Sequence, residues 1–244
     1  MSKIRIIPVT TRKGLRAFVN FYYELYKGNK FAVPFLRFDE MNTLSKHKNP
    51  AFEFCEAQYF LAVDSEARIV GRVAAIINRR ANEQWNKKQV RFGWFDFVDD
   101  LEVSQALLNA VEAWGRTKGM TECVGPLGFT DMDREGLLIE GFHHKSTMYI
   151  NYNYPYYKNH MEAMSFYEKD NDWLEYRIKV PEETPAKFAR TAEMIEKRYN
   201  LHVHKFTSRE LVHGGMGREV FHIVNETYKR SEERRVGKEC RSRW

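Results

Sequence analysis

Arg91–Phe129 reads RFGWFDFVDDLEVSQALLNAVEAWGRTKGMTECVGPLGF and predicts a strand, a helix and a second strand in immediate succession. Coenzyme- and nucleotide-binding enzymes hold phosphate at the helix N-terminus of such a unit, because backbone N–H groups face the anion there. In this chain the turn is Asp99–Asp100, and no glycine falls between Gly93 and Gly115. Two carboxylates would repel a pyrophosphate at that position. The stretch therefore predicts the architecture of a coenzyme-binding transferase without its phosphate cradle.

The chain has 244 residues and 43% hydrophobic content, as expected of a globular protein. Its formal charge of +6 comes mainly from the segment Lys229–Trp244, and the remainder is nearly balanced. A nearly balanced charge over the rest of the chain argues against a nucleic-acid partner. No signal-peptide stretch opens the chain, and its longest aliphatic run, Val73–Ile77, is too short to cross a bilayer. We therefore expect a cytoplasmic protein with no membrane partner.

The three cysteines, Cys55, Cys123 and Cys240, are widely separated and form no Cys-x-x-Cys or Cys/His ligand spacing. Such a distribution indicates reduced thiols in a reducing compartment. It also predicts that the protein uses no metal, since closely spaced Cys and His ligands are absent.

Apolar periodicity and Gly/Pro punctuation predict the remaining elements. Helices are expected over 10–28, 37–44, 156–164, 186–199 and 219–228, and strands over 4–9, 57–64, 69–78, 173–180 and 201–206. The strands at 57–64 and 69–78 are close enough to form a hairpin.

Two further segments carry a family resemblance: GPLGFTDMDREGLLIEGF (Gly125–Phe142) and YINYNYPYYKNHMEAMSF (Tyr149–Phe166). Together with the order of strands and helices, they resemble the GNAT superfamily of acyl-CoA N-acyltransferases. They are most similar to a bacterial family of two tandem GNAT-like domains, in which Gly-Pro, GLL-EGF and N-x-P-Y-Y segments follow in this order. The resemblance covers about residues 4–228. It implies an α/β (α+β) fold, with a splayed mixed central sheet flanked by helices and the start of a second similar domain.

On this resemblance we divide the chain into three parts. Residues 1–180 are expected to form a GNAT-like N-terminal domain, and residues 181–228 the opening segment of a truncated second one. Residues 229–244 resemble a translated vector or adapter sequence and are interpreted as a non-native basic tail, the alternative being a native tail.

In GNAT enzymes the central strand pairs through its backbone with the pantetheine arm of acyl-CoA. The resemblance therefore implies Phe95, Phe97 and Val98 as coenzyme-binding candidates. The following helix in those enzymes begins with an Arg/Gln-x-x-Gly-x-Gly/Ala turn that holds the pyrophosphate. DDLEVS at Asp99–Ser104 departs from this pattern.

A second departure concerns the tyrosine that often serves as the general acid in GNAT enzymes. His160 stands where that tyrosine is expected, and Ser165–Phe166 replaces the Gly-Phe pair that follows it. Both departures imply that this domain is a degenerate half. Acetyl-CoA or another acyl-CoA would then be bound only by the second domain.

The candidate acceptor pocket is the polar-aromatic stretch Asn151, Tyr152, Asn153 and Tyr156, whose rings and amides could orient a substrate. The alternative interpretation is a loop packed on the sheet with its tyrosine hydroxyls in solvent. Tyr149 belongs to the same stretch.

His143, His144 and Tyr157 are the catalytic candidates, since a neutral imidazole could remove the amine proton before acyl transfer. Adjacent histidines on a strand would point to opposite faces, so at most one could serve. A polar loop pair is the simpler explanation of the two histidines.

Three functions stay open at this stage. The first is an N-acyltransferase, with this chain an incomplete fragment, that moves an acyl group from acyl-CoA to a small-molecule amine or peptide. The second is a non-catalytic, degenerate GNAT-like domain that serves as the acceptor-binding or structural half of a larger protein. The third is an aminoacyl transferase with a charged-tRNA donor, which the nearly neutral body disfavours.

Overall fold

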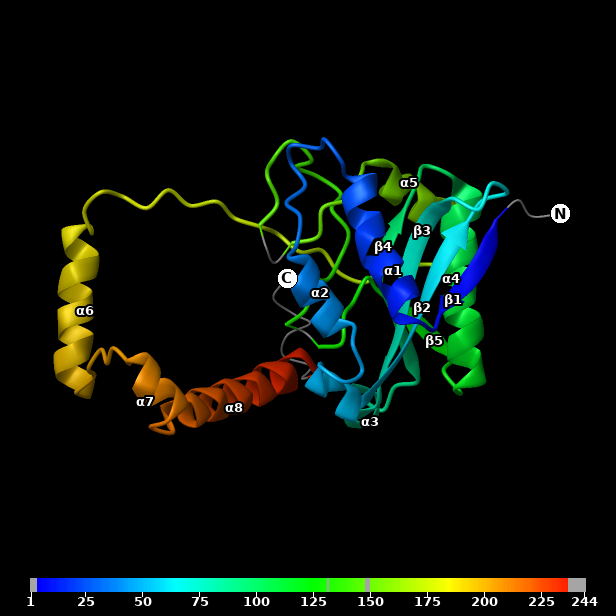
Figure 1. The fold of residues 1–244 in the computed structure, drawn as a ribbon. Coiled ribbons are helices and arrows are strands. Elements are labelled where there is room, and N and C mark those ends of the chain that lie inside the picture. The colour runs from blue at the N-terminus through cyan, green and yellow to red at the C-terminus, as the bar shows by residue number, and fades with distance from the viewer. Residues whose placement is uncertain (1–3, 131, 148–149, 237–244) are drawn as a thin grey trace. The chain divides into compact units, whose positions relative to one another are not determined.

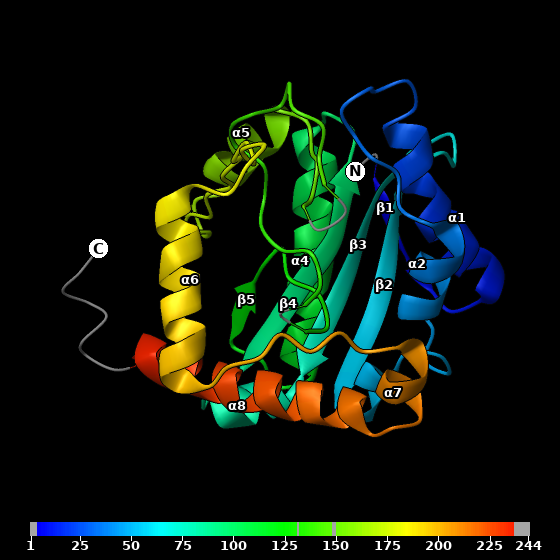
Figure 2. The same ribbon diagram turned by 90° about the vertical axis from the view of Figure 1, so that its left-hand side faces the viewer.

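A computed structural model describes residues 4–130, 132–147 and 150–236 of the chain, which divides into two units, Met1–Leu174 and Glu175–Trp244. Unit 1 contains a five-stranded sheet in the order β1-β2-β3-β4-β5. The strands are β1 (Arg5–Val9), β2 (Cys55–Val63), β3 (Ile69–Asn78), β4 (Gln89–Phe97) and β5 (Glu122–Val124). All neighbours are antiparallel except β4 and β5, which run parallel. Strands β2 to β5 follow one another across Figure 2.

Helices cover both faces of this sheet (Figure 1). Helix α4 (Leu101–Thr117) packs on one face, and α1 (Arg12–Leu25) packs on the other. The shorter elements of unit 1 are α2 (Arg37–Thr43), a 3-10 turn (Pro50–Glu53), α3 (Arg79–Gln84) and α5 (Tyr156–Ala163). The predicted mixed sheet flanked by helices is therefore confirmed.

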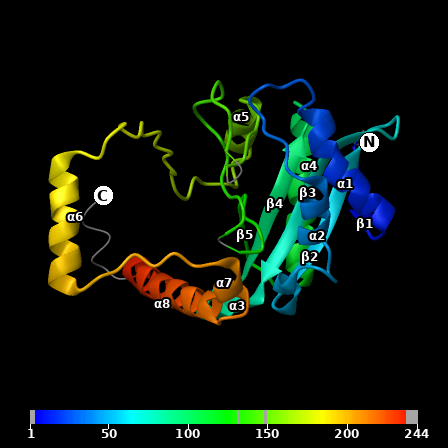
Figure 3. The same ribbon diagram turned by 60° about the vertical axis from the view of Figure 1, so that its left-hand side comes forward.

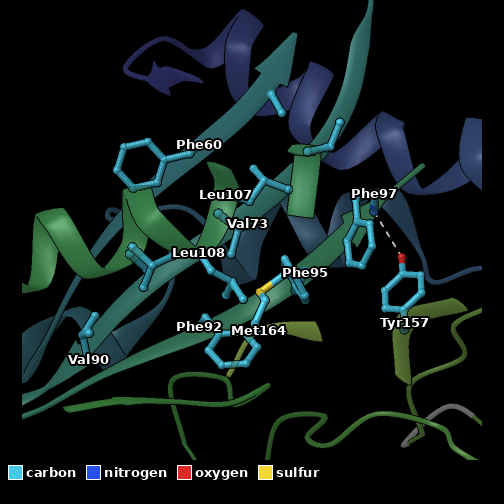
Figure 4. Packing of buried hydrophobic residues seen from close by; sticks show 14 of the residues in the cluster. Phe60, Val73, Val90, Phe92, Phe95, Phe97, Leu107, Leu108, Tyr157 and Met164 are labelled. Atoms are coloured by element: carbon cyan, nitrogen blue, oxygen red, sulfur yellow. Dashed lines mark hydrogen bonds between the residues drawn. The ribbon is translucent and has the colours of Figure 1, made fainter. Parts of the chain in front are cut away.

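Strict alternation along β3 explains why both faces are apolar. Val73, Ala75 and Ile77 pack toward α4 together with its Val103, Leu107, Leu108 and Val111, as Figure 4 shows for several of these residues. Ala74 and Ile76 pack toward α1, where Phe18 and Val19 cover them. Because successive side chains of a strand point to opposite faces, an uninterrupted apolar run is what a sheet between two helical layers requires.

β4 breaks this alternation at Trp94. Arg72 of β3 pairs with Asp96, whereas Ala74 pairs with Gly93, so β4 has one extra residue opposite Val73. Trp94 has a φ of 45°, an uncommon value for a residue with a side chain. This is a β-bulge, which shifts the alternation by one residue. As a result Phe92, Phe95 and Phe97 all pack in the cluster that faces α4.

β4 and β5 pair for only three residues and then part. The register joins Gln89–Arg91 to Glu122–Val124, and a cis peptide between Gly125 and Pro126 follows. The Leu127 N–H donates to the Phe92 carbonyl at 2.8 Å, and a side chain at Gly93 would approach the Leu127 carbonyl to 2.5 Å. Glycine is therefore required where the departing chain crosses β4. Figure 3 shows α5 beside the far end of β4.

Unit 2 contains the helices α6 (Ala186–Tyr199), α7 (Ser208–Val212) and α8 (Met216–Val236). The predicted strands at 173–180 and 201–206 are wrong: neither range contains strand residues, and neither belongs to the sheet of the described chain. A strand needs a ladder partner for its backbone groups, and periodicity alone cannot supply one. Residues 237–244 of the predicted tail lie outside the described residues. Tyr149 lies outside them as well. None of the described helices is both long and apolar enough to cross a membrane.

Candidate functional site

A cavity of about 300 Å³ lies on the face of the sheet that α1 covers. Its walls combine α1, α2, β3, β4 and the loops at 126–137 and 151–153. The polar residues that line it are Tyr22, Asp39, Glu40, Thr43, Arg72, Asp96, Asp133, Arg134, Asn151, Tyr152 and Asn153, together with the indole of Trp94. Several of these polar side chains are buried, which is unusual unless they are paired or functional.

A buried ion pair forms one wall. Arg72 is 2% exposed and Asp96 is 7% exposed. The Arg72 Nε and Nη2 atoms both lie 2.7 Å from Asp96 Oδ2, and Nη1 donates to the Phe18 carbonyl at 3.0 Å. The two residues are cross-strand neighbours in the register, and the bulge turns Asp96 to the same face as Arg72. Each charge thus compensates the other, because a single unpaired charge buried there would destabilise the fold.

Glu40 organises the opposite wall. Its Oε1 accepts from Arg134 Nη2 at 2.5 Å, and its Oε2 accepts from the Trp94 indole N–H at 2.7 Å. The Arg134 guanidinium lies 3.1 Å from the centroid of the Phe35 ring. Glu40 is buried, so these two bonds replace its lost hydration.

The Tyr22 hydroxyl differs from the other buried groups. It is the only buried side-chain N or O atom of the described residues without a hydrogen-bond partner. Burial, followed by the charge of Asp96, raises the pKa of the Tyr22 phenol. The hydroxyl therefore stays protonated and neutral at physiological pH, as a donor and acceptor beside the cavity.

Asp133 lies on the same side, where burial raises the pKa of its carboxyl above the ordinary value. Its Oδ2 accepts from the Thr130 N–H at 3.0 Å, which partly offsets the burial. Thus the cavity contains one poorly hydrated carboxyl that is held by backbone hydrogen bonds from Thr130 and Phe129.

Three of the four residues predicted for the substrate pocket, Asn151, Tyr152 and Asn153, line this cavity. Asn153 exchanges hydrogen bonds with the N–H and C=O of Leu138, at 2.7 and 3.0 Å, and Asn151 donates to the Gly136 carbonyl at 3.2 Å. These amides hold the GLL segment as a cavity wall. Their role toward a substrate stays a prediction.

Tyr156, the fourth predicted pocket residue, does not line the cavity and lies at the C-terminal end of β4. Its hydroxyl donates to the Phe97 carbonyl at 2.5 Å, and the Tyr157 hydroxyl accepts from the Phe97 N–H at 3.1 Å (Figure 4). Tyr157 is fully buried, which raises the pKa of its phenol well above the ordinary value. Two adjacent tyrosines of α5 therefore satisfy both backbone groups of Phe97.

Of the three coenzyme-binding candidates, Phe95 and Phe97 lie on this stretch of β4, and Val98 follows it directly. Phe95 and Phe97 are buried in the apolar cluster, and the Val98 N–H donates to the Val70 carbonyl at 3.0 Å. A pantetheine arm would need the backbone groups of Phe97 that the tyrosines now bind. The arrangement of unit 1 therefore does not fit a coenzyme arm along this edge.

The N-terminus of α4 is also closed to an anion. Asp100 caps the helix, with its Oδ1 accepting from the Glu102 N–H at 2.9 Å. Asp99 Oδ1 lies 3.0 Å from His160 Nε2, and His160 Nδ1 lies 2.9 Å from the Ser104 hydroxyl. Ser104 is fully buried, so this serine–histidine–aspartate row joins α5 to α4 and presents no nucleophile. The absence of a phosphate site at this helix end stays a prediction.

His143 and His144 lie in an exposed loop and do not line the cavity. Their rings are 4.1 Å apart between centroids, so the expectation of opposite faces was wrong, because the pair lies in a turn and not on a strand. Their catalytic role stays a prediction. No cluster of three or more His, Cys, Asp or Glu side chains within the described ranges could hold a metal.

The sequence interpretation missed Tyr22, Glu40, Arg72 and Asp96. Two of them had a usable signal: Arg72 is the single charge of an otherwise apolar strand, and Asp96 is one of only two charges in another. A buried charge needs a partner, so each should have suggested the other. Tyr22 and Glu40 carried no comparable signal.

The scan for protein families found no matching family model. The chain is 32% identical to Protein YghO of Escherichia coli over 157 residues, which cover 64% of this chain and 40% of that protein. It is 28% identical to the bacterial ceramide synthase of Caulobacter vibrioides over 175 residues, which cover 71% of this chain and 45% of that protein. The chain thus spans less than half the length of either relative.

Two solved structures are similar at low identity. One is a Pyrococcus furiosus protein assigned as an acetyl transferase, with 13% identity, a TM-score of 0.40, and coverage of 71% of this chain and 100% of that one. The other is a GNAT-family acetyltransferase of Staphylococcus aureus, with 14% identity, a TM-score of 0.34, and coverage of 48% and 69%.

Proposed function

We propose that this chain is part of an N-acyltransferase that moves an acyl group from acyl-CoA to an amine, and that unit 1 supplies the acceptor site. The cavity with the buried Arg72–Asp96 pair carries this proposal, because a concave site with a few convergent polar groups is the usual form of a small-molecule site. The ceramide synthase relative supports amide formation, since a ceramide contains an acyl group joined to an amine nitrogen.

The coenzyme is proposed not to bind at the N-terminus of α4 in unit 1. Asp100 already caps that helix, and the α5 tyrosines occupy the backbone groups of Phe97. The relatives are more than twice as long as the matched region, which leaves room for a coenzyme-binding domain. Residues 181–228 are proposed as the opening of that domain.

The exposed side chains of unit 2 support this division. Phe188, Tyr199 and Phe221 are each more than 60% exposed, and Ile223 is 63% exposed. Clusters of large, solvent-exposed apolar side chains usually mark a surface that packs against another domain or protein. A domain that continues beyond these helices would cover them. The proposed basic tail plays no part in this argument.

The reaction itself sets what the acceptor site must do. The amine nitrogen attacks the thioester carbonyl, a C–N bond forms, the C–S bond breaks and the coenzyme leaves as a free thiol. The attacking nitrogen must be unprotonated, so the ammonium has to lose a proton first. Carboxylates near the cavity can bind the ammonium, while His143, His144 and Tyr157 stay candidates for proton transfer.

A second candidate is a non-catalytic half that binds the acceptor or has a structural role. The closed α4 corner favours it, because this chain then has no described place for the coenzyme diphosphate. The two candidates differ in whether the longer protein turns over acyl-CoA.

The test uses the longer protein and the chain of 244 residues side by side. With acyl-CoA and a panel of amines, the longer protein should release free thiol in an amine-dependent manner, detected with a thiol-reactive dye. The chain alone should show no thermal shift with acetyl-CoA, whereas a ligand at a hundred times its Kd would stabilise by about 2.7 kcal/mol. Amine-independent or absent thiol release by the longer protein would contradict acyl transfer.

A further inference from the structure

The exposed charges of unit 1 are unevenly distributed between its two helical layers. Between Arg12 and Glu53, the stretch that contains α1 and α2, eight Lys or Arg side chains and three Asp or Glu side chains are exposed. Between Asp99 and Lys118, the stretch that contains α4, two exposed cations stand against three exposed carboxylates. The α1 and α2 side of the sheet is therefore basic, whereas the α4 side is weakly acidic.

Helices α1 and α2 form one continuous layer. The Arg37 Nε of α2 donates to Asn20 Oδ1 of α1 at 3.2 Å, and the Arg37 guanidinium lies 3.8 Å from the centroid of the Tyr23 ring. Leu15 of α1 and Met41 of α2 pack in the same cluster. Figures 1 and 3 show both helices on the same face of the sheet. Their exposed side chains therefore belong to one surface.

The fold itself does not account for these cations. None of the eight forms an ion pair with a carboxylate of the described residues, whereas Arg116 on α4 pairs with Glu112. Arg12 and Lys13 stand in the first turn of α1, which contains no acidic residue. A helix N-terminus carries partial positive charge, so cations there destabilise the helix. Unpaired cations at an unfavourable position indicate a negatively charged partner outside the chain.

Three large apolar side chains are exposed on the same side. Leu36, the N-cap residue of α2, is 64% exposed, Phe38 of α2 is 66% exposed and Met132 is 71% exposed. Leu36 and Met132 both line the cavity, so they lie at its mouth. Apolar side chains beside Lys and Arg are typical of surfaces that lie in the interface of an anionic bilayer. A nucleic acid would use the cations but would leave the aliphatic side chains without a matching contact.

We propose that this α1/α2 surface, made of the exposed cations of residues 12–48 with Leu36, Phe38 and Met132, binds anionic lipid at the surface of a bilayer. The cations contact lipid phosphates, and the three apolar side chains enter the boundary of the acyl chains. Such attachment needs no helix that crosses the membrane. It departs from the sequence expectation of no membrane partner, which rested on the lack of a spanning segment. It is independent of the proposed acyl transfer.

The experiment measures binding of the 244-residue chain to lipid vesicles by cosedimentation. One set of vesicles contains phosphatidylcholine alone, and the other contains phosphatidylcholine with the anionic lipid phosphatidylglycerol. The chain should bind the anionic vesicles at least about tenfold more tightly, because each cation near an anionic surface contributes about fivefold in affinity. Added salt should weaken this binding, since it screens exposed charges.

The first pair of variants locates the cations that bind. Lys13→Gln with Arg16→Gln should weaken binding to anionic vesicles by more than about tenfold. Arg234→Gln with Arg235→Gln is the matched control, because it removes the same charge from the basic tail. The control should lose much less affinity. A control that loses as much as the α1 variant would assign the binding to the tail and overturn the inference.

The second pair tests the apolar contact. Phe38→Ala should lower the affinity for anionic vesicles by about tenfold, because the ring no longer enters the acyl boundary. Leu101→Ala is the control: it truncates an apolar side chain at the start of α4 that is 42% exposed, and it should keep the affinity. Both positions are exposed, so the Tm of each variant should match that of the wild type, which separates binding from folding.

The inference is overturned if the chain does not bind anionic vesicles, if it binds both kinds of vesicle equally, or if Phe38→Ala binds as the wild type does. A single-stranded oligonucleotide that displaces the vesicles and loses affinity in the Lys13→Gln, Arg16→Gln variant would also overturn it, and would identify the surface as a nucleic-acid site. None of these readouts involves thiol release, so failure here leaves the proposed function standing.

Discussion

The two sides of β4 differ in what they leave unsatisfied. On the α1 side, the strand contributes Trp94 and Asp96 to a cavity lined with charges and one orphan hydroxyl. On the α5 side, the backbone N–H and C=O of Phe97 are both bound by tyrosines, and the surroundings are aromatic. The unpartnered polar group therefore lies on the α1 side, whereas the backbone groups on the α5 side are satisfied. The family resemblance had pointed to the other side.

A hydrogen-bonded path nevertheless links the two sides. The Tyr26 hydroxyl lies 3.3 Å from Asp96 Oδ1 and 3.2 Å from the Tyr157 hydroxyl. Burial, with the charges of Tyr157 and Asp96, raises the pKa of Tyr26 well above its ordinary value. The cavity's ion pair and the strand edge are therefore parts of one buried polar network, and substitutions on each side can show how far they depend on one another.

The largest effect is expected from Arg72→Met, which leaves Asp96 buried without its cation. Removal of one partner of a buried ion pair typically costs about 3–5 kcal/mol. Urea denaturation of the chain should show a loss of this size. Arg116→Met is the control: it breaks the exposed pair with Glu112, and its cost should stay below about 1 kcal/mol.

A double variant, Arg72→Met with Asp96→Leu, tests whether the unpaired charge causes the loss of stability. Because this double variant leaves no unpaired charge, it should recover most of the stability that Arg72→Met loses. A double variant as unstable as the single one would mean that the pair matters through packing and not through charge.

Tyr157→Phe should have the next largest effect, since it strips the Phe97 N–H of its partner in a fully buried place. An unsatisfied buried group costs about 1–3 kcal/mol. Tyr156→Phe is the matched change on the neighbouring residue, which is half-buried, and should cost less because water can reach the Phe97 carbonyl. If the two variants lost equal free energy of unfolding in chemical denaturation, water would reach the α5 side more easily than its aromatic packing suggests.

Asp100→Ala probes the closed end of α4 on the same side. Loss of an N-cap carboxylate costs about 1 kcal/mol, whereas Asp100→Asn keeps a good cap and should be nearly neutral. Both free energies can be measured by thermal denaturation. If the alanine variant matched the wild type, the cap would contribute nothing and the corner would be freer for an anion than its geometry indicates.

The smallest effect concerns Asp133 and depends on pH. Its folded pKa is raised by burial, so the folded state holds its proton more tightly than the unfolded chain. Stability from this group is therefore present below the unfolded pKa and is lost as pH rises through the folded pKa. Asp133→Asn should be more stable than wild type at neutral pH, and the gain should vanish in acid. A gain that is independent of pH would contradict this origin.

Much of the scaffold could be predicted because its signals are local. The hairpin strands, the amphipathic α4 with its stop at Gly119 and the helix after Pro155 all follow from periodicity and punctuation within one segment. The predicted strands at 173–180 and 201–206 were wrong because strand pairing depends on a distant segment and not on a local signal. They alternate correctly but have no partner strand in the described chain.

The candidate site was only partly predictable because it is assembled from distant segments. Asn151 and Asn153 could be found as a dense polar stretch, but nothing local connects them to Tyr22 or Glu40. Those residues meet only when α1 and α2 fold against β4. The bulge was equally invisible, since Trp94 is an unusual residue for a positive φ.

That single inserted residue has a consequence for any comparison between this chain and other proteins. A strand of regular pleat, aligned residue by residue with β4 up to Gly93, would direct the counterpart of Asp96 toward α4 and the counterpart of Phe97 toward the cavity on the α1 side. Functional positions beyond Gly93 must therefore be matched by facing direction, with a one-residue gap, before roles are transferred between such sequences.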